Sequence, residues 1–317
     1  MPIADSGYPG HPRLAALVQR ARERALHAPP TVGLVYPCDA LALEAAAGML
    51  REGIARPLLV GPREQVLRAA EAAGVDASDF EIVDTDTAPT EAALRATALA
   101  RQGVVAAMMK GSLHTDELLS AVVHKAGGLR THARISHAFL FDLPRYHKLL
   151  ALADCVVNIA PNLATKRDIL GNAVGLLQRL GIAAPKVGIV AAVETVNPAI
   201  PATVDAQALV QMASNGAWPG AIVEGPFGFD IAFSAEAART KKVESQVAGD
   251  ADLLLMPDLN AGNMLYKGFN HVGGGDCAGL VLGARVPIVL TSRADSLGAR
   301  LASVALAVLA ADTTRQD

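Results

Sequence analysis

A serine, an arginine and an aspartate lie close together in the segment VPIVLTSRADS, residues 286–296. Ser292, Arg293 and Asp295 stand between an apolar run and a predicted helix. The amides of a helix N-terminus, a guanidinium fork and a hydroxyl together suit a phosphate or acyl-phosphate group. Asp295 could act beside them as a general base or hold Arg293 in place. The same spacing also fits a helix cap at Asp295 or Ser296 with a surface ion pair at Arg293.

A second group of polar side chains lies in MPDLNAGNMLYKG, residues 256–268. Asp258, Asn260 and Asn263 follow a predicted strand, and Lys267 comes about one helical turn after Asn263. We expect these side chains to contact a substrate at the mouth of a site. The alternative is a turn with a helix N-cap at Asn260 or Asn263.

A third group lies in MMKGSLHTDELL, residues 108–119. Lys110 ends a predicted strand, which suggests a contact with an anion, and Gly111 and Ser112 continue the loop. Thr115 fits the same site, although it is equally typical of a helix N-cap. We therefore predict that Lys110, Gly111, Ser112 and Thr115 bind substrate.

The elements that must position these groups are short apolar runs that alternate with helical patterns. The predicted strands are 32–36, 57–60, 81–83, 104–109, 135–141, 155–159, 187–193, 221–223, 252–256, 279–282 and 287–290. Repeated strand–helix units predict parallel sheets with helices on both faces. Because ligands of such sheets bind beyond the carboxyl ends of the strands, three more polar residues at strand ends are candidates: Glu194, Asn197 and Glu224.

Ten or more strands are many for one open sheet, so the sequence favours two α/β domains. The segment DLPRYH, residues 142–147, interrupts the pattern. We predict two doubly wound α/β domains. The first comprises residues 1–143 and, through a returning C-terminal helix, 296–317, and the second comprises 144–295.

Composition and absent motifs exclude several classes of protein. The 317 residues carry 28 basic and 31 acidic side chains, a net charge of -3, which gives no general attraction for nucleic acid or an anionic membrane. Neither a signal peptide nor a membrane-spanning run is present, and the three cysteines lie far apart, so we expect a cytoplasmic protein.

The chain lacks GxxxxGK[ST], a GxGxxG after a strand, GxSxG and HExxH, and its histidines have no ligand spacing. We expect no metal site.

The segment VAGDADLLLMPDLNAGNMLYKG, followed by GLVLGARVPIVLTSRADS, resembles the phosphate acetyl/butyryltransferases, or phosphotransacylases. MMKGSLHTDELL, VNPAIPATVDAQAL and EGPFGFDIAFS resemble other blocks of that family and come in the expected order. The resemblance extends from about Val32 to Ala311.

The resemblance implies the reaction of a short acyl-CoA, acetyl or butyryl, with phosphate to give acyl phosphate and CoA. It also implies two α/β domains with an interdomain cleft, like the isocitrate and isopropylmalate dehydrogenases, and a homodimer. Ser292 and Arg293 match the catalytic Ser-Arg pair of the acetyltransferases. The aspartate that follows that serine by seven residues there is Ala299 in this chain. Asp295 is the nearest carboxylate in the loop, and its role as a base is our inference.

Direct attack within a ternary complex agrees with the lack of a nucleophile–base motif. It needs no metal and no permanently bound cofactor, with CoA acting as a substrate. Two alternatives stay open from the sequence. The chain could be a non-catalytic homologue that binds CoA or acyl phosphate, or a dehydrogenase on the related scaffold.

Overall fold

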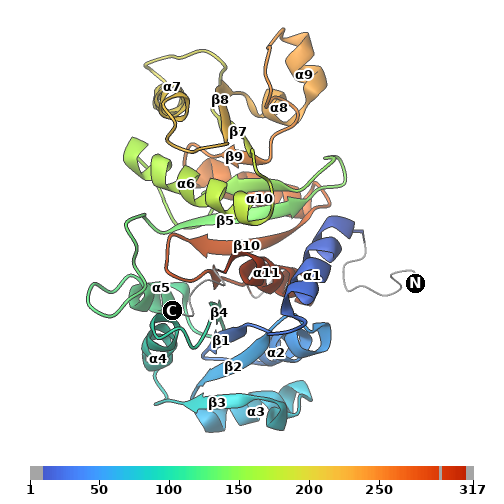
Figure 1. The fold of residues 1–317 in the computed structure, drawn as a ribbon, viewed down its shortest axis with the longest axis vertical. Coiled ribbons are helices and arrows are strands. Elements are labelled where there is room, and N and C mark those ends of the chain that lie inside the picture. Colours follow the sequence, from blue (N-terminus) through green and yellow to red (C-terminus); the bar gives the residue numbers. More distant parts are fainter. Residues whose placement is uncertain (1–9, 293–294, 312–317) are drawn as a thin grey trace. The chain divides into compact units, whose positions relative to one another are not determined.

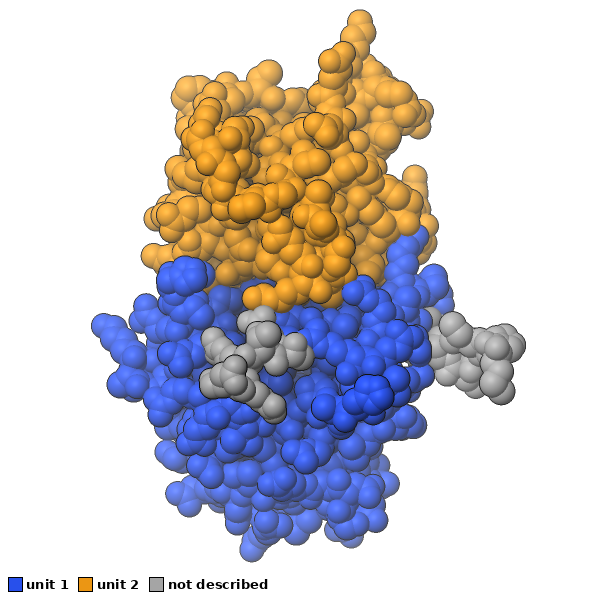
Figure 2. Space-filling model, viewed as in Figure 1, with its two compact units in different colours: residues 1–133, 278–317 blue, residues 134–277 orange. Residues whose placement is uncertain are grey.

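The computed structural model describes residues 10–292 and 295–311 (Figure 1). The chain divides into two compact units, coloured separately in Figure 2. Unit 1 comprises residues 1–133 and 278–317, and unit 2 comprises residues 134–277. The predicted folding domains, 1–143 with 296–317 and 144–295, stay a prediction.

Unit 1 is built on strands in the order β3-β2-β1-β4-β11-β10. Their bounds are β1 Thr31–Val35, β2 Arg56–Gly61, β3 Glu81–Asp84, β4 Ala107–Lys110, β10 Asp276–Leu282 and β11 Ile288–Val289. Strand β10 begins two residues before the unit boundary and pairs antiparallel to β11, whereas the other described pairs of this unit are parallel. The carboxyl ends of β1, β4 and β11 therefore meet at one edge of the sheet.

The helices of unit 1 lie between these strands in sequence. Their bounds are α1 Pro12–Ala25, α2 Ala40–Glu52, α3 Arg63–Ala73, α4 Pro89–Arg101, α5 Thr115–Val122 and α11 Leu297–Ala310, with a 3-10 turn at Ala77–Asp79. The strand order reverses direction after β3, so right-handed crossovers place α4 on the face opposite α2 and α3. The contacts agree, because α1, α11, α2 and α3 touch in series while α4 touches α5.

Unit 2 has the strand order β5-β6-β9-β7-β8. Its strands are β5 Ser136–Asp142, β6 Leu150–Ala153, β7 Lys186–Val190, β8 Ile222–Phe227 and β9 Leu253–Leu255. Its helices are α6 Leu163–Arg179, α7 Pro201–Ser214, α8 Phe229–Phe233, α9 Ala235–Thr240 and α10 Leu259–His271. The pairs among β6, β9, β7 and β8 are parallel, and β5 runs antiparallel to β6.

The helix α11 shows how this alanine-rich chain forms a core. Every residue from Ala299 to Ala310 is buried, and the helix packs against α1, α2, β4 and β11. Small side chains let helices approach closely: a side chain at Gly48 of α2 would press on Leu301 at 3.0 Å. The predicted α/β class, with helices wound on largely parallel strands, is confirmed.

One predicted strand is wrong. Residues 155–159 form a turn, because the side chain of Asp154 accepts hydrogen bonds from the amides of Val156 and Val157 at 2.8 and 3.0 Å. The strand here is β6, which begins five residues earlier at Leu150, where no strand was predicted. The antiparallel pairs at β5–β6 and β10–β11 also depart from the predicted parallel pattern.

Within residues 10–292 and 295–311, no helix combines the length and apolar character needed to cross a membrane.

Candidate functional site

The edge of unit 1 where β1, β4 and β11 end gathers two of the predicted groups. Val35 of β1 pairs with Lys110 of β4, and Val289 of β11 pairs with Met109. The hydroxyl of Thr291 is 3.4 Å from the carbonyl oxygen of Lys110. The loop after β4 and the loop after β11 are therefore neighbours, as the rule for strand ends predicts.

The loop after β4 is fixed to the end of β1 by hydrogen bonds. The amide of Gly111 donates to Val35 O at 2.9 Å, and the hydroxyl of Ser112 donates to Tyr36 O at 2.9 Å while accepting from the amide of Cys38 at 3.1 Å. A Cβ at Gly111 would lie 2.5 Å from Tyr36 O, so only glycine permits this close approach. Gly111 and Ser112 thus position the loop that carries Lys110.

The ammonium group of Lys110 turns back over this loop. Its Nζ donates to Gly111 O at 3.2 Å and to Leu113 O at 3.0 Å, and the side chain is half-buried. Thr115 is the first residue of α5 and is half-buried, and the N-cap position belongs to His114. The N-cap alternative for Thr115 is therefore wrong, because the chain enters the helix one residue earlier.

The loop before α11 forms a tight turn around Ser292 and Asp295. The amide of Ser292 donates to Asp295 Oδ2 at 2.7 Å, and the amide of Asp295 donates to Ser292 O at 3.2 Å. Ser292 is exposed and Asp295 is half-buried. Arg293, the third predicted catalytic residue, lies outside the described residues. The turn brings a hydroxyl and a carboxylate side by side at the sheet edge.

The start of α11 confirms one of the two caps suggested by the sequence. The hydroxyl of Ser296 accepts from the amide of Ala299 at 3.0 Å, so Ser296 is the N-cap and Asp295 is not. Ala299 itself is buried, and its carbonyl accepts from the hydroxyl of Ser303 at 2.8 Å. The position that carries the aspartate in the resembling acetyltransferases is therefore an alanine packed inside unit 1. The carboxylate within the turn is that of Asp295.

In unit 2, the predicted group around α10 is held by a close helix–loop contact. Asp258 is the N-cap of α10 and accepts from the amide of Ala261 at 3.0 Å. The predicted cap at Asn260 or Asn263 is therefore wrong, because the chain turns helical immediately after Asp258. The amide of Asn263 donates through Nδ2 to Cys155 O at 3.1 Å, which fixes the helix to the turn after β6.

The exposed residues of α10 differ from these anchored ones. Asn260 and Lys267 are exposed, whereas Gly262 is buried against the turn after β6. Asn260 and Lys267 are thus the polar side chains of this group that α10 presents to solvent.

A buried polar centre beneath α10 was missed by the sequence analysis. Asp154 is 3% exposed, and its carboxylate accepts from the amide of His137 at 3.2 Å and from Nδ2 of Asn158 at 2.6 Å, besides the two turn amides. Burial lowers the pKa of His137 to about 4, although the Asp154 carboxylate acts in the opposite direction. The signal that could have found this centre is an aspartate at the start of the apolar run DCVVN.

The loop after β7 carries Glu194 and Asn197. Lys241 donates to Glu194 Oε1 at 2.8 Å and lies 3.0 Å from Asp230. The hydrogen bond from Lys241 lowers the pKa of the Glu194 carboxyl. Asn197 Oδ1 accepts from the amide of Ala199 at 2.9 Å. Glu194 thus ties the loop to α8 and α9 through Lys241, whereas Asn197 shapes the loop itself.

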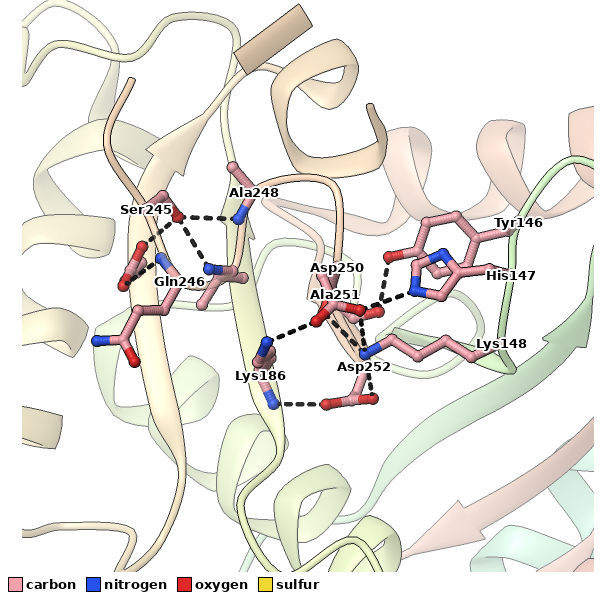
Figure 3. A network of polar contacts seen from close by, with 12 residues as sticks. Tyr146, His147, Lys148, Lys186, Ser245, Gln246, Ala248, Asp250, Ala251 and Asp252 are labelled. Carbon is pink, nitrogen blue, oxygen red and sulfur yellow. Dashed lines mark hydrogen bonds and ion pairs between the residues drawn. The ribbon is translucent and has the colours of Figure 1, made fainter. Parts of the chain in front are cut away.

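Glu224 plays a similar part at β8. Its carboxylate accepts from the hydroxyl of Ser245 and from the amide of Gln246, the latter at 3.3 Å (Figure 3). Ser245 in turn accepts from the amides of Val247 and Ala248 at 2.9 and 2.8 Å. Glu224 therefore orders the segment that leads into β9.

The same figure shows a charged cluster at the other ends of these strands. Asp250 accepts from Lys186 at 2.5 Å and from His147 at 2.8 Å and pairs with Lys148 at 2.9 Å, while Lys148 also pairs with Asp252 at 2.7 Å (Figure 3). Burial raises the pKa of Asp250, but the hydrogen bonds from the two lysines and the histidine outweigh it and hold the pKa well below its ordinary value. Because Lys186 and Asp252 lie at the amino ends of β7 and β9, this cluster stabilises unit 2 away from the strand ends that carry the candidate residues.

The candidate residues accordingly form two sets. Unit 1 carries Lys110, Gly111, Ser112, Thr115, Ser292 and Asp295, and unit 2 carries Glu194, Asn197, Glu224, Asp258, Asn260, Asn263 and Lys267. Across the part of the chain that the structure describes, no group of three or more His, Cys, Asp or Glu could hold a metal ion. The amides and cations among the candidates are groups that suit the binding of an anion, and a hydroxyl and a carboxylate lie in the turn before α11.

Comparison with known proteins gives a consistent result. The model of the family described as phosphate acetyl/butaryl transferase matches residues 86–308. A phosphate acetyltransferase of Rhizobium meliloti is 47% identical over 300 residues, which cover 94% of this chain and 93% of that protein. A phosphate butyryltransferase of Clostridium acetobutylicum is 40% identical over 280 residues, 88% of this chain and 93% of that protein.

The fold agrees with a solved structure of the same kind. A branched-chain phosphotransacylase from Enterococcus faecalis superposes with a TM-score of 0.78 at 29% identity, covering 89% of this chain and 98% of that chain. The predicted α/β fold is therefore found in a protein of closely matching length.

Proposed function

Because the chain belongs to the phosphate acetyl/butyryl transferase family, we propose that it transfers a short acyl group, acetyl or butyryl, between CoA and inorganic phosphate. The observation that carries this proposal is the 47% identity over 94% of the chain to a phosphate acetyltransferase. In the balanced reaction, acyl-CoA and phosphate give acyl phosphate and CoA. The carbon–sulfur bond of the thioester breaks and a carbon–oxygen bond to phosphate forms.

We assign the chemistry to the turn before α11. In the direction of acyl-CoA synthesis, a base takes the proton of the CoA thiol, whose pKa lies well above 7, and the thiolate attacks the acyl carbonyl carbon. The carbon–oxygen bond then breaks and phosphate leaves. Asp295 is the proposed base, Ser292 the hydrogen-bonding partner of a carbonyl or phosphate oxygen, and Arg293 the cation that neutralises the phosphate.

Direct attack in a ternary complex suits this assignment, because no covalent enzyme intermediate is needed. A donor aimed at charge that develops in the transition state is typically worth about 3 kcal/mol. The helix N-terminus of α11 adds to the field at the turn, since its amides carry partial positive charge. Together these groups would lower the barrier without a metal and without a permanently bound cofactor, with CoA as a substrate.

The remaining candidates form the proposed substrate-binding set. Lys110, Asn260 and Lys267 are cationic or amide groups suited to the phosphates of the substrates. Gly111, Ser112 and Thr115 shape the loop after β4. Glu194, Asn197, Glu224, Asp258 and Asn263 set the loops and the helix start of unit 2 through the hydrogen bonds described above. We further propose a cytoplasmic homodimer that acts on small molecules.

The test is thiol release from acetyl-, propionyl- and butyryl-CoA in the presence of phosphate or arsenate. We expect turnover with at least one of the three, and an Arg293→Ala variant that loses most of it. The control is Arg95→Ala, because Arg95 is an exposed arginine on α4 that does not belong to the candidate set. An Arg293→Ala variant with wild-type turnover would refute the site, whereas lack of turnover by the wild type with all three substrates would refute the function.

The alanine at position 299 favours one alternative, a homologue that binds CoA or acyl phosphate without turning it over. Such a protein would show an increased melting temperature with CoA and no thiol release. A dehydrogenase would instead reduce NAD with a hydroxy acid. The three outcomes are distinct in the same set of assays.

A further inference from the structure

A charged side chain lies inside the most apolar helix of the protein. Arg300 is 5% exposed, and its neighbours along α11 from Leu301 to Ala310 are buried and, apart from Ser303, apolar. Taking a guanidinium out of water is costly unless its donors are satisfied by good acceptors. The acceptors of the Arg300 guanidinium therefore indicate which part of the structure this buried charge stabilises.

All three nitrogens of the guanidinium group meet the turn before α11. Nη2 donates to Ser292 O at 2.6 Å, Nη1 donates to Thr291 Oγ1 at 3.3 Å, and Nε donates to Asp295 O at 3.3 Å. The acceptors lie on both sides of residues 293–294. One planar fork thus fixes the entry and the exit of the turn at once.

These contacts also determine which way the turn faces. The carbonyls of Ser292 and Asp295 are turned toward the buried guanidinium, while the amides of the same two residues are hydrogen-bonded within the turn. Ser292 is exposed, so the fork holds through its carbonyl a residue that lies at the surface. The hydroxyl of Thr291 links the fork further to Lys110 O at 3.4 Å, at the end of β4.

We propose that Arg300 is a positioning residue for acyl transfer, which sets the Ser292–Asp295 turn in its working geometry from inside the helix. This inference rests on the proposed function, because the turn carries the residues assigned to the chemistry. Arg300 itself touches neither substrate nor reacting atoms. A displacement of about 1 Å at a reacting group can reduce a rate by about 100-fold, so loosening the turn should act on kcat.

The experiment compares Arg300→Met, Arg300→Lys and a matched control, Arg24→Met. Arg24 makes the same kind of contact with the other end of the same helix, donating to Leu309 O at 2.8 Å and to Ala311 O at 2.7 Å. Methionine keeps much of the side-chain length and removes the fork. Lysine keeps one charged donor group and cannot reach three acceptors in the plane of a guanidinium.

We expect kcat of Arg300→Met to fall by about 10- to 100-fold with KM for acyl-CoA nearly unchanged. Arg300→Lys should recover part of the loss, and Arg24→Met should keep the wild-type kcat. A folded Arg300→Met whose kcat is within 2-fold of the wild type would overturn the proposal. If Arg300→Met does not fold, Arg300→Lys decides in the same way: an unchanged kcat overturns the proposal, and a reduced kcat at unchanged KM supports it.

A second readout separates this inference from the proposed function. Hydrogen exchange at the amides of Ser292 and Asp295, which are both hydrogen-bonded within the turn, reports the turn directly and needs no turnover. Faster exchange there in the Arg300 variants, and not in Arg24→Met, supports the positioning role even if no acyl-CoA is turned over. Equal exchange in all variants overturns it even if the enzyme is active.

Discussion

Replacing Gly262 by alanine should destabilise unit 2, whereas the same replacement at Gly268 in the same helix should not. A Cβ built on Gly262 lies 2.5 Å from Asp154 O and 3.1 Å from Cys155 Cα, while a Cβ on Gly268 meets nothing within 4 Å. Ordinary contact begins at 3.4 Å, so α10 or the turn after β6 must move by about 0.9 Å to accept Gly262→Ala.

The magnitude follows from two opposing effects. Replacing glycine by alanine within a helix raises the free energy of unfolding by about 1 kcal/mol, and this effect is the same in both variants. Overpacking typically costs about 1–3 kcal/mol, and the upper part of that range applies at Gly262 because the clash is with backbone atoms. Gly262→Ala should therefore lower the free energy of unfolding by about 1–2 kcal/mol, and Gly268→Ala should raise it by up to about 1 kcal/mol. The two variants should differ by about 2–3 kcal/mol.

Urea unfolding followed by circular dichroism measures this difference through the transition midpoints of the wild type and the two variants. The anchored residues Asp258 and Asn263 move with the start of α10, so Gly262→Ala should also reduce acyl transfer, and Gly268→Ala should not. If the two variants have equal midpoints, the close approach of α10 to the Asp154–Cys155 backbone is not the constraint described here.

Two predictions concern pH. Burial holds the pKa of His137 at about 4, below its ordinary value. On acidification the unfolded chain therefore binds the proton before the folded protein does. The free energy of unfolding should fall between about pH 6.5 and pH 4, by at most about 1.4 kcal/mol per pH unit. His137→Gln should flatten this slope in urea titrations, and identical slopes would contradict the assignment. Asp250 has a lowered pKa, so its contribution is complete above about pH 4 and is lost below it. Asp250→Asn should cost about 1 kcal/mol at pH 7, after a discount for screening at a carboxylate 40% exposed, and the gap to the wild type should narrow on acidification below about pH 4; a gap as wide at pH 2 as at pH 7 would contradict this.

Features that depend on local signals could be predicted from the sequence. Ser296 was a predicted cap and is the cap of α11. The predicted helix over 63–73 matches α3, which ends at Gly74 with φ 64°. The polar residues after β4 and β11 were expected at strand ends and lie there, because an apolar run followed by a polar loop marks the carboxyl end of a buried strand.

Features that depend on long-range partners could not be predicted. In sequence, Arg300 interrupts an apolar helix and has no sign of burial, because its acceptors are carbonyls that only the folded turn brings together. The carboxylate of Asp154 also accepts from the amide of His137, 17 residues earlier in the chain, and this contact has no local signal. Glu194 and Glu224 were identified as strand-end carboxylates, but their partners, Lys241 and Ser245, lie 47 and 21 residues further along the chain.

The most direct test of the account is the stoichiometry of acyl transfer by the wild-type protein. Incubation with phosphate and acetyl-, propionyl- or butyryl-CoA should release free CoA thiol and form acyl phosphate, trapped as the hydroxamate, in a one-to-one ratio for at least one substrate. Thiol release without acyl phosphate would indicate simple thioester hydrolysis. That result, or the absence of thiol release from all three substrates, would contradict the proposal that the turn before α11 transfers an acyl group to phosphate.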